Sequence, residues 1–144
     1  MKNQITVEIE SHLPVSALWT CFTEAHHIMN WNFAHESWHC PHAALDFKVG
    51  GTFSYRMEAK DGSFGFDLNG VFTQISHEQM FGFNLEDGRQ VELIFTHHNG
   101  ISKVTETFEP ESENALDHQQ LGWQMILNNF KQYAERQYAA LVKS

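Results

Sequence analysis

Apolar residues near the C-terminus recur with the period of an α-helix. Their steps of three, four and seven place them on one stripe, which comprises Leu116, Trp123, Leu127, Phe130, Ala134, Tyr138 and Leu141. The pattern predicts a long helix from about Asn114 to Val142, with Ser112 or Asn114 as its N-cap. At about 1.5 Å per residue such a helix is roughly 42 Å long. A single long helix with one apolar stripe needs a sheet to cover it.

Most of the remaining chain alternates apolar and polar residues, which is typical of half-buried strands. The first predicted strand spans residues 4–12, and two short helices follow at Val15 to Phe22 and Ala25 to Asn30. Residues 31–42 show no regular pattern and are predicted as an irregular, aromatic-rich segment. Further strands are predicted at 43–47, 53–58, 64–72, 80–85, 91–97 and 101–109.

Turn signals such as Asp61-Gly62 and Asn99-Gly100 join these strands as consecutive hairpins, so the sheet is expected to be antiparallel. The predicted fold class is α+β, with a seven-stranded antiparallel sheet curved around the long C-terminal helix and two short helices after the first strand. Curvature of the sheet would leave a cavity between sheet and helix. We expect residues 1–144 to form a single domain.

The formal charge of −9 argues against nucleic-acid binding, because contacts to phosphates need clustered Lys and Arg. No apolar run is long enough to span a bilayer, so no membrane insertion is expected. With no signal-peptide pattern at the start, and with Cys21 and Cys40 interpreted as reduced thiols, the expected location is the cytoplasm, although one disulfide would also fit. Twelve phenylalanines and four tryptophans indicate an aromatic core or an apolar pocket.

The chain resembles the START-like helix-grip (SRPBCC) superfamily and, within it, the group named after the activator of heat-shock protein 90 ATPase. The matching pieces, in order, are Val7-x-Ile9, Pro14, Leu18-Trp19-x-x-Phe22, Trp31, Gly50-Gly51-x-Phe53-x-Tyr55, Asp61-Gly62, Gly70-Val71-Phe72, Gly122-Trp123 and Leu127-x-Asn129-Phe130-x-x-Tyr133. The resemblance implies the same curved sheet and helix with a ligand cavity between them. Known members bind lipids, sterols, polyketides or hormones, and some are cyclases or hydrolases.

The leading hypothesis is binding of a small hydrophobic or aromatic molecule in this cavity without catalysis and without a cofactor. The residues expected to line the site are Trp31, Phe33, Trp38, Phe53, Tyr55, Phe66, Phe72, Phe95, Trp123 and Leu127. A protein-contact module that stimulates a chaperone ATPase is one alternative, although the sequence shows no counterpart of the namesake's separate N-terminal domain. Exposed sheet edges also leave a homodimer open.

A second alternative is an enzyme of the cyclase or hydratase type that uses a carboxyl group in the cavity. Glu106 lies between Val104 and Phe108 on the face that those residues would bury, and a carboxyl in an apolar pocket is a candidate general acid or base. His97 would be its partner. A twisted strand that leaves Glu106 in solvent is the competing interpretation.

Histidines in the irregular segment suggest a metal site. His35-Glu36-Ser37-Trp38-His39 matches the H-E-x-x-H pattern of zinc hydrolases, with His42 nearby as a further ligand. That motif needs a regular helix, for which the surrounding residues offer little support. An aromatic lid over the cavity is therefore the preferred interpretation of this segment, and no metal is assigned.

Overall fold

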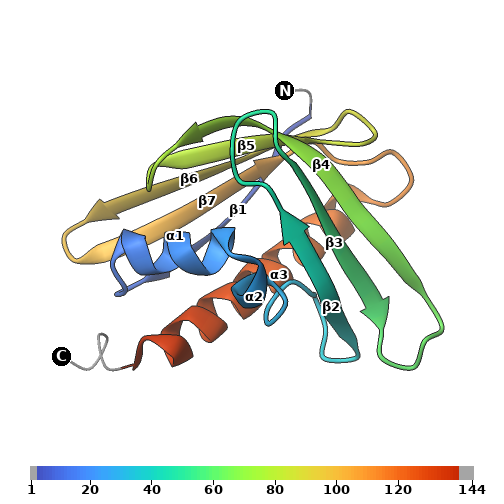
Figure 1. The fold of residues 1–144 in the computed structure, drawn as a ribbon, viewed down its shortest axis with the longest axis horizontal. Coiled ribbons are helices and arrows are strands. Elements are labelled where there is room, and N and C mark those ends of the chain that lie inside the picture. Colours follow the sequence, from blue (N-terminus) through green and yellow to red (C-terminus); the bar gives the residue numbers. More distant parts are fainter. Residues whose placement is uncertain (1–2, 140–144) are drawn as a thin grey trace.

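The computed structural model describes residues 3–139, which fold into a curved sheet with helices on its concave side (Figure 1). In chain order the elements are β1 (Ile5–Ser11), α1 (Val15–Thr23), α2 (Ala25–Ile28), β2 (Trp38–Leu45), β3 (Thr52–Ala59), β4 (Gly65–Ser76), β5 (Met80–Leu85), β6 (Gln90–His98), β7 (Ile101–Phe108) and α3 (Leu116–Gln137). The predicted α+β class and the seven-stranded antiparallel sheet around a long helix are confirmed.

The sheet order is β1-β7-β6-β5-β4-β3-β2, so the first two strands of the chain lie at opposite edges. Helices α1 and α2 form the connection between these edges (Figure 1). From β2 onward each strand pairs with the next, as the hairpin signals predicted. Asn99 and Gly100 adopt φ values of 51° and 77°, which the tight turn between β6 and β7 requires.

Helix α3 packs mainly against β1 and also contacts α1. Its side chains Leu127, Phe130 and Ala134 are almost fully buried, in agreement with the predicted stripe. Leu116 does not follow this pattern: it is 58 % exposed, whereas Gln119 is the buried residue of this first turn. Leu141 lies outside the described residues, so the predicted end of the stripe stays a prediction.

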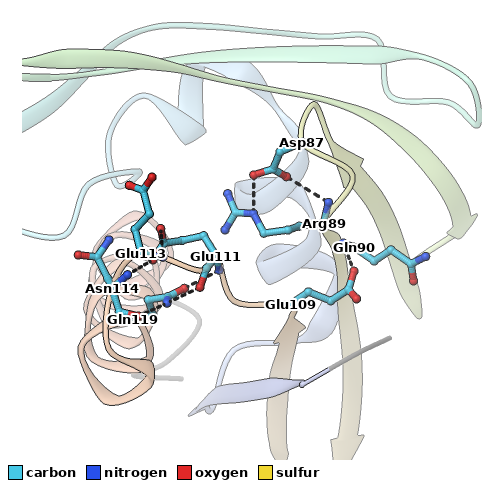
Figure 2. Close-up of polar contacts among 8 residues, drawn as sticks. All are labelled: Asp87, Arg89, Gln90, Glu109, Glu111, Glu113, Asn114 and Gln119. Carbon is cyan, nitrogen blue, oxygen red and sulfur yellow. Dashed lines mark hydrogen bonds and ion pairs between the residues drawn. The ribbon is translucent and has the colours of Figure 1, made fainter.

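The prediction that Ser112 or Asn114 caps α3 is wrong. The N-cap is Ala115, whose side chain has no capping group, and the segment before it takes over the role (Figure 2). The Glu111 carboxylate accepts a hydrogen bond from the backbone N–H of Asn114 at 2.7 Å, which holds the pKa of Glu111 below its usual value. The buried Gln119 amide donates to the carbonyls of Glu111 at 3.0 Å and Asn114 at 2.8 Å. The start of α3 is therefore fixed by side chains on both sides of it.

A second polar group in Figure 2 fixes the neighbouring end of the sheet. Arg89 donates through Nε to Asp87 at 2.7 Å, and the backbone N–H of Gln90 donates to the Glu109 carboxylate at 2.6 Å. The Arg89–Asp87 contact lies within the turn before β6, and the Gln90–Glu109 hydrogen bond links the start of β6 to the residue after β7, from which the chain continues toward α3.

The segment predicted as irregular, 31–42, is in part a strand. Its second half belongs to β2, which begins at Trp38 and carries a bulge between His39 and His42. The bulge, next to Pro41, shifts the side-chain alternation and so hides this first part of β2 from pattern analysis, whereas residues 43–45 lie within the strand predicted at 43–47. Among the described residues, no helix is both long and apolar enough to cross a membrane.

Candidate ligand-binding cavity

A cavity lies between the concave face of the sheet and α3. Its volume is about 80 Å³, which is enough for several water molecules. Ordinary ligand pockets are larger, with about 300–1,000 Å³. Its walls come from α1, α2, the segment after α2, five strands and α3. The lining residues are Phe22, Ile28, Trp31, Asn32, Leu45, Phe47, Tyr55, Met57, Leu68, Phe72, Phe81, Phe83, Glu106, Trp123, Ile126 and Leu127.

Half of the residues proposed from the sequence lie on this lining: Trp31, Tyr55, Phe72, Trp123 and Leu127. They come from the segment after α2, from β3 and β4, and from α3. The structure therefore brings together residues that are more than ninety positions apart in the chain, from Trp31 to Leu127.

The other proposed residues, Phe33, Trp38, Phe53, Phe66 and Phe95, do not line the cavity. Two of them are core residues: Phe53 stacks on Tyr55 at 4.8 Å between ring centres, and Phe95 packs edge-to-face on Trp19 at 5.1 Å. Both side chains point to the inner face of the sheet, as predicted, but they pack within the core and do not border the cavity.

The remaining three lie toward the outside of the molecule. Trp38 packs against Phe64 and Phe66, with ring centres 5.9 and 6.1 Å apart, and Phe66 is 41 % exposed. These rings sit where β4 begins, beyond the reach of α3. Phe33 is half-buried, and its backbone carbonyl accepts a hydrogen bond from Asn129 of α3 at 2.5 Å.

Phe81 and Phe83 are lining residues that the sequence reasoning missed. They alternate on the inner face of β5, with centres 6.3 Å apart, so the signal was present in the predicted strand 80–85. What the pattern could not provide is the distance of each strand from α3, which decides whether an inward ring borders the cavity.

Glu106 points into the cavity, as the inward interpretation of its strand predicted. It is 7 % exposed, and its neighbours across the sheet are the apolar Val7 and Leu93. Among the described residues, no group donates a hydrogen bond to its carboxyl or pairs with its charge. Burial therefore raises the pKa of Glu106 to about 8. The carboxyl group is mostly neutral at pH 7.

His97 is not the partner of Glu106. Its Nδ1 lies 2.8 Å from the hydroxyl of Ser102, on the same β6–β7 hairpin but toward its turn. The Ser102 hydroxyl donates its own proton to the carbonyl of Leu13 at 2.6 Å, so the His97 Nδ1–H is the donor to Ser102. A catalytic pair of Glu106 and His97 is thus contradicted by the geometry.

Two other polar side chains reach the cavity, Asn32 and Tyr55. Burial raises the pKa of the Tyr55 phenol well above its usual range, so the hydroxyl stays protonated. The indole N–H of Trp31 is already used, since it donates to the carbonyl of Cys21 at 3.0 Å. The site is therefore an apolar, aromatic chamber with a small number of polar groups.

Trp123 forms the wall contributed by α3. Its ring stacks flat on Phe108, with centres 3.9 Å apart and an angle of 9° between the planes. A Cβ at the preceding residue, Gly122, would meet nothing within 4 Å, so this glycine does not serve a close approach of α3 to a strand.

The histidines of the H-E-x-x-H match do not form a helical zinc motif. His39 lies in β2, with Nε2 3.6 Å from the Glu58 carboxylate, and His35 hydrogen-bonds to Ser37 in the preceding bend. His42 follows the bulge of β2. Among the described residues, the group with spacing suited to a metal ion is instead Glu24, His26 and His27, which is mostly exposed.

Both cysteines are free and buried in the core. Burial raises the pKa of each thiol to about 11, so both are protonated at neutral pH. Neither is therefore placed for nucleophilic chemistry.

Comparison with known proteins gives a family. Residues 12–135 match the family model described as Activator of Hsp90 ATPase homolog 1-like protein. No curated protein matches the chain.

Solved structures agree with that match. An AHSA1-like protein from Aeromonas hydrophila is 39 % identical, with a TM-score of 0.84 over 95 % of each chain. Chr148 from Cytophaga hutchinsonii is 42 % identical, with a TM-score of 0.81, also over 95 % of each chain. NE0264 from Nitrosomonas europaea shares the fold, with a TM-score of 0.80 at 15 % identity over 94 % of this chain and 96 % of the other.

Proposed function

This chain belongs to the Activator of Hsp90 ATPase homolog 1-like family, within the START-like helix-grip superfamily, and we propose that it binds a small, mainly apolar ring compound between the sheet and α3. The fold and the family are consistent with a ligand-binding module. The observation that carries the proposal is the aromatic cavity itself, whose walls come from helices and strands distant in the sequence.

The size of the cavity limits the ligand. A cavity of about 150 Å³ lined by apolar side chains is known to accept benzene. The 80 Å³ available here is smaller, so even a one-ring ligand requires lining side chains to move. Trp123 and Ile126 are only partly buried and line the cavity from α3, which makes them the residues expected to shift.

The test is an NMR titration of the isotopically labelled protein with α-methylstyrene, a one-ring hydrocarbon. Saturable shifts centred on Trp31, Trp123 and Leu127 are expected. A matched pair of variants on β4 gives the control: Leu68→Phe fills the cavity and should abolish these shifts, whereas Val71→Phe adds the same ring to the 41 % exposed outer face. Absence of saturable binding, or equal binding by both variants, would contradict the proposal.

Catalysis on the same ligand is a second candidate, favoured by Glu106 in the cavity wall. A carboxyl group that is still protonated near neutral pH is suited to act as a general acid. Compounds that bind would be incubated with the protein and analysed by mass spectrometry for conversion. Turnover that Glu106→Gln abolishes while binding persists would support an enzyme, and recovery of unchanged compounds would leave binding as the function.

A further inference from the structure

Glu106 is a polar side chain for which the protein supplies no partner. It is 93 % buried, it faces the cavity, and within residues 3–139 nothing hydrogen-bonds to it or neutralises it. Buried polar groups are normally hydrogen-bonded, so an orphaned carboxyl beside a cavity points to a missing partner. The partner would have to enter the cavity.

The groups facing Glu106 determine its protonation state. Its strand neighbours Val7 and Leu93 carry no charge, and α3 contributes Trp123, Ile126 and Leu127 to the cavity. Tyr55 of β3 is the other titratable group on the lining, and its phenol is neutral. With no cation in this set, burial favours the neutral carboxylic acid. A neutral carboxylic acid has one O–H to donate as well as a carbonyl oxygen that accepts, and none of the residues that the structure describes accepts a hydrogen bond from this O–H.

The geometry points to a ligand with a carbonyl oxygen, and we propose that the neutral carboxyl of Glu106 donates a hydrogen bond to it. The ligand class is a small, uncharged ring compound that bears a ketone, aldehyde or amide. This inference rests on the proposed function, since it specifies the chemistry of the same cavity.

An ammonium ligand fits the cavity less well. An ammonium group carries three N–H donors, and apart from Glu106 only Tyr55 and Asn32 offer polar atoms on the lining. Ionising Glu106 to pair with the ammonium would also place two charges in an apolar chamber, where the desolvation cost can exceed the Coulombic gain. A carbonyl oxygen brings no donor and needs only the one that Glu106 offers.

Three ring compounds of nearly equal shape test this directly: acetophenone, α-methylstyrene and 1-phenylethylamine. They differ in carrying C=O, C=CH2 or a protonated amine next to the ring. In NMR titrations at pH 6, acetophenone is expected to bind the wild-type protein about 2- to 10-fold more tightly than α-methylstyrene, the ratio for one net hydrogen bond. The amine should bind most weakly.

Two substitutions separate the donor from the charge. Glu106→Leu removes the donor and should bring acetophenone to the affinity of α-methylstyrene. Glu106→Gln keeps an N–H donor and should keep the preference, although its amide does not titrate. Far-UV circular dichroism of each variant verifies that it is folded.

The pH dependence gives an independent readout. Because Glu106 loses its proton near pH 8, acetophenone should bind the wild-type protein about 2- to 6-fold more weakly at pH 9 than at pH 6 and approach the affinity of α-methylstyrene. α-Methylstyrene, and acetophenone with Glu106→Gln, should show no such change.

The outcomes distinguish this inference from the proposed function. Equal affinity for acetophenone and α-methylstyrene, or tighter binding of the amine, would overturn the inference and leave a binding cavity. A failure of all three compounds to bind would overturn both.

Discussion

Two buried polar residues on one face of β7 lie in different surroundings. Ser102 is completely buried, and its hydroxyl donates to Leu13 at 2.6 Å and accepts from His97 at 2.8 Å. Glu106, four residues later on the same face, is 7 % exposed and has no hydrogen bond within the described chain. Ser102 ties the β6–β7 hairpin to the segment after β1, whereas Glu106 borders the cavity.

The difference shows how structural and functional polarity can be told apart. A buried hydroxyl that both donates and accepts a hydrogen bond within the protein stabilises the fold and needs no partner from a ligand. A buried carboxyl with none made is a cost to the fold, and such costs gather at functional sites. Substitutions at fully packed residues and at residues that border the cavity are therefore expected to change stability by different amounts.

Truncation in the packed region should have the largest effect. Phe130 of α3 is completely buried and packs against Phe22 and Trp31, with ring centres 4.8 and 5.1 Å away. Phe130→Ala is expected to lower the free energy of unfolding by about 3–5 kcal/mol. Ile126→Ala, one turn earlier on the cavity wall, should cost clearly less, because part of its side chain borders empty space. Urea unfolding measures the free energy of unfolding of both variants. Equal losses would contradict the expected difference between a fully packed residue and one that borders the cavity.

Stability should fall with rising pH because of Glu106. Its pKa is about 8 in the folded protein and 4.5 as the reference for the unfolded chain, so the folded state binds more protons between these values. The free energy of unfolding then falls by up to about 1.4 kcal/mol per pH unit, which is about 2–3 kcal/mol from pH 5 to 7. Below pH 4.5 Glu106 is protonated in both states and causes no destabilisation, and above pH 8 the destabilisation no longer changes with pH.

The measurement compares urea unfolding of the wild type and Glu106→Gln at pH 5, 6 and 7. The variant should gain on the wild type as the pH rises, since other titrating groups are common to both. Parallel curves would mean that Glu106 ionises freely in the folded state, and the distinction from Ser102 would then be lost.

Ser102→Ala should lower the free energy of unfolding by about 1–3 kcal/mol. The substitution leaves the Leu13 carbonyl without its donor and His97 without its acceptor, and buried unsatisfied groups bear that cost. Thr105→Ala, on the opposite face of the same strand, should stay within about 0.5 kcal/mol. Thermal unfolding of the pair provides the comparison, and a similar shift for both would show that the Ser102 hydrogen bonds contribute little.

Much of this fold follows from local sequence pattern. Alternation fixes which side of each strand faces inward, and for this reason Glu106 could be placed on the buried face from Val104 and Phe108 alone. The long helix and the Asn99-Gly100 turn are also local signals. The first part of β2, residues 38–42, was not predicted because its bulge breaks the alternation, whereas residues 43–45 lie within the predicted strand 43–47.

The cavity depends on distances that pattern does not contain. Trp31 and Trp38 have similar sequence surroundings, yet one lines the cavity and the other packs beside the exposed Phe64. Which ring borders the empty space depends on where α3 crosses the sheet. That crossing is determined by long-range contacts such as the hydrogen bond from Asn129 to Phe33.

A pair of tyrosines offers the smallest and most selective test of the comparison. Tyr133 is buried, and its hydroxyl hydrogen-bonds to Nδ1 of His27 at 2.6 Å, whose ring is kept neutral because burial lowers the pKa of His27. Tyr133→Phe should therefore cost about 0.5–1.5 kcal/mol, the net contribution of one hydrogen bond. Tyr55→Phe removes a hydroxyl that faces the cavity and has no protein partner in the described chain, so stability should change by less than about 0.5 kcal/mol. Urea unfolding at pH 7 gives both values. A loss at Tyr55 as large as at Tyr133 would mean that its hydroxyl serves the fold and is not available to a ligand.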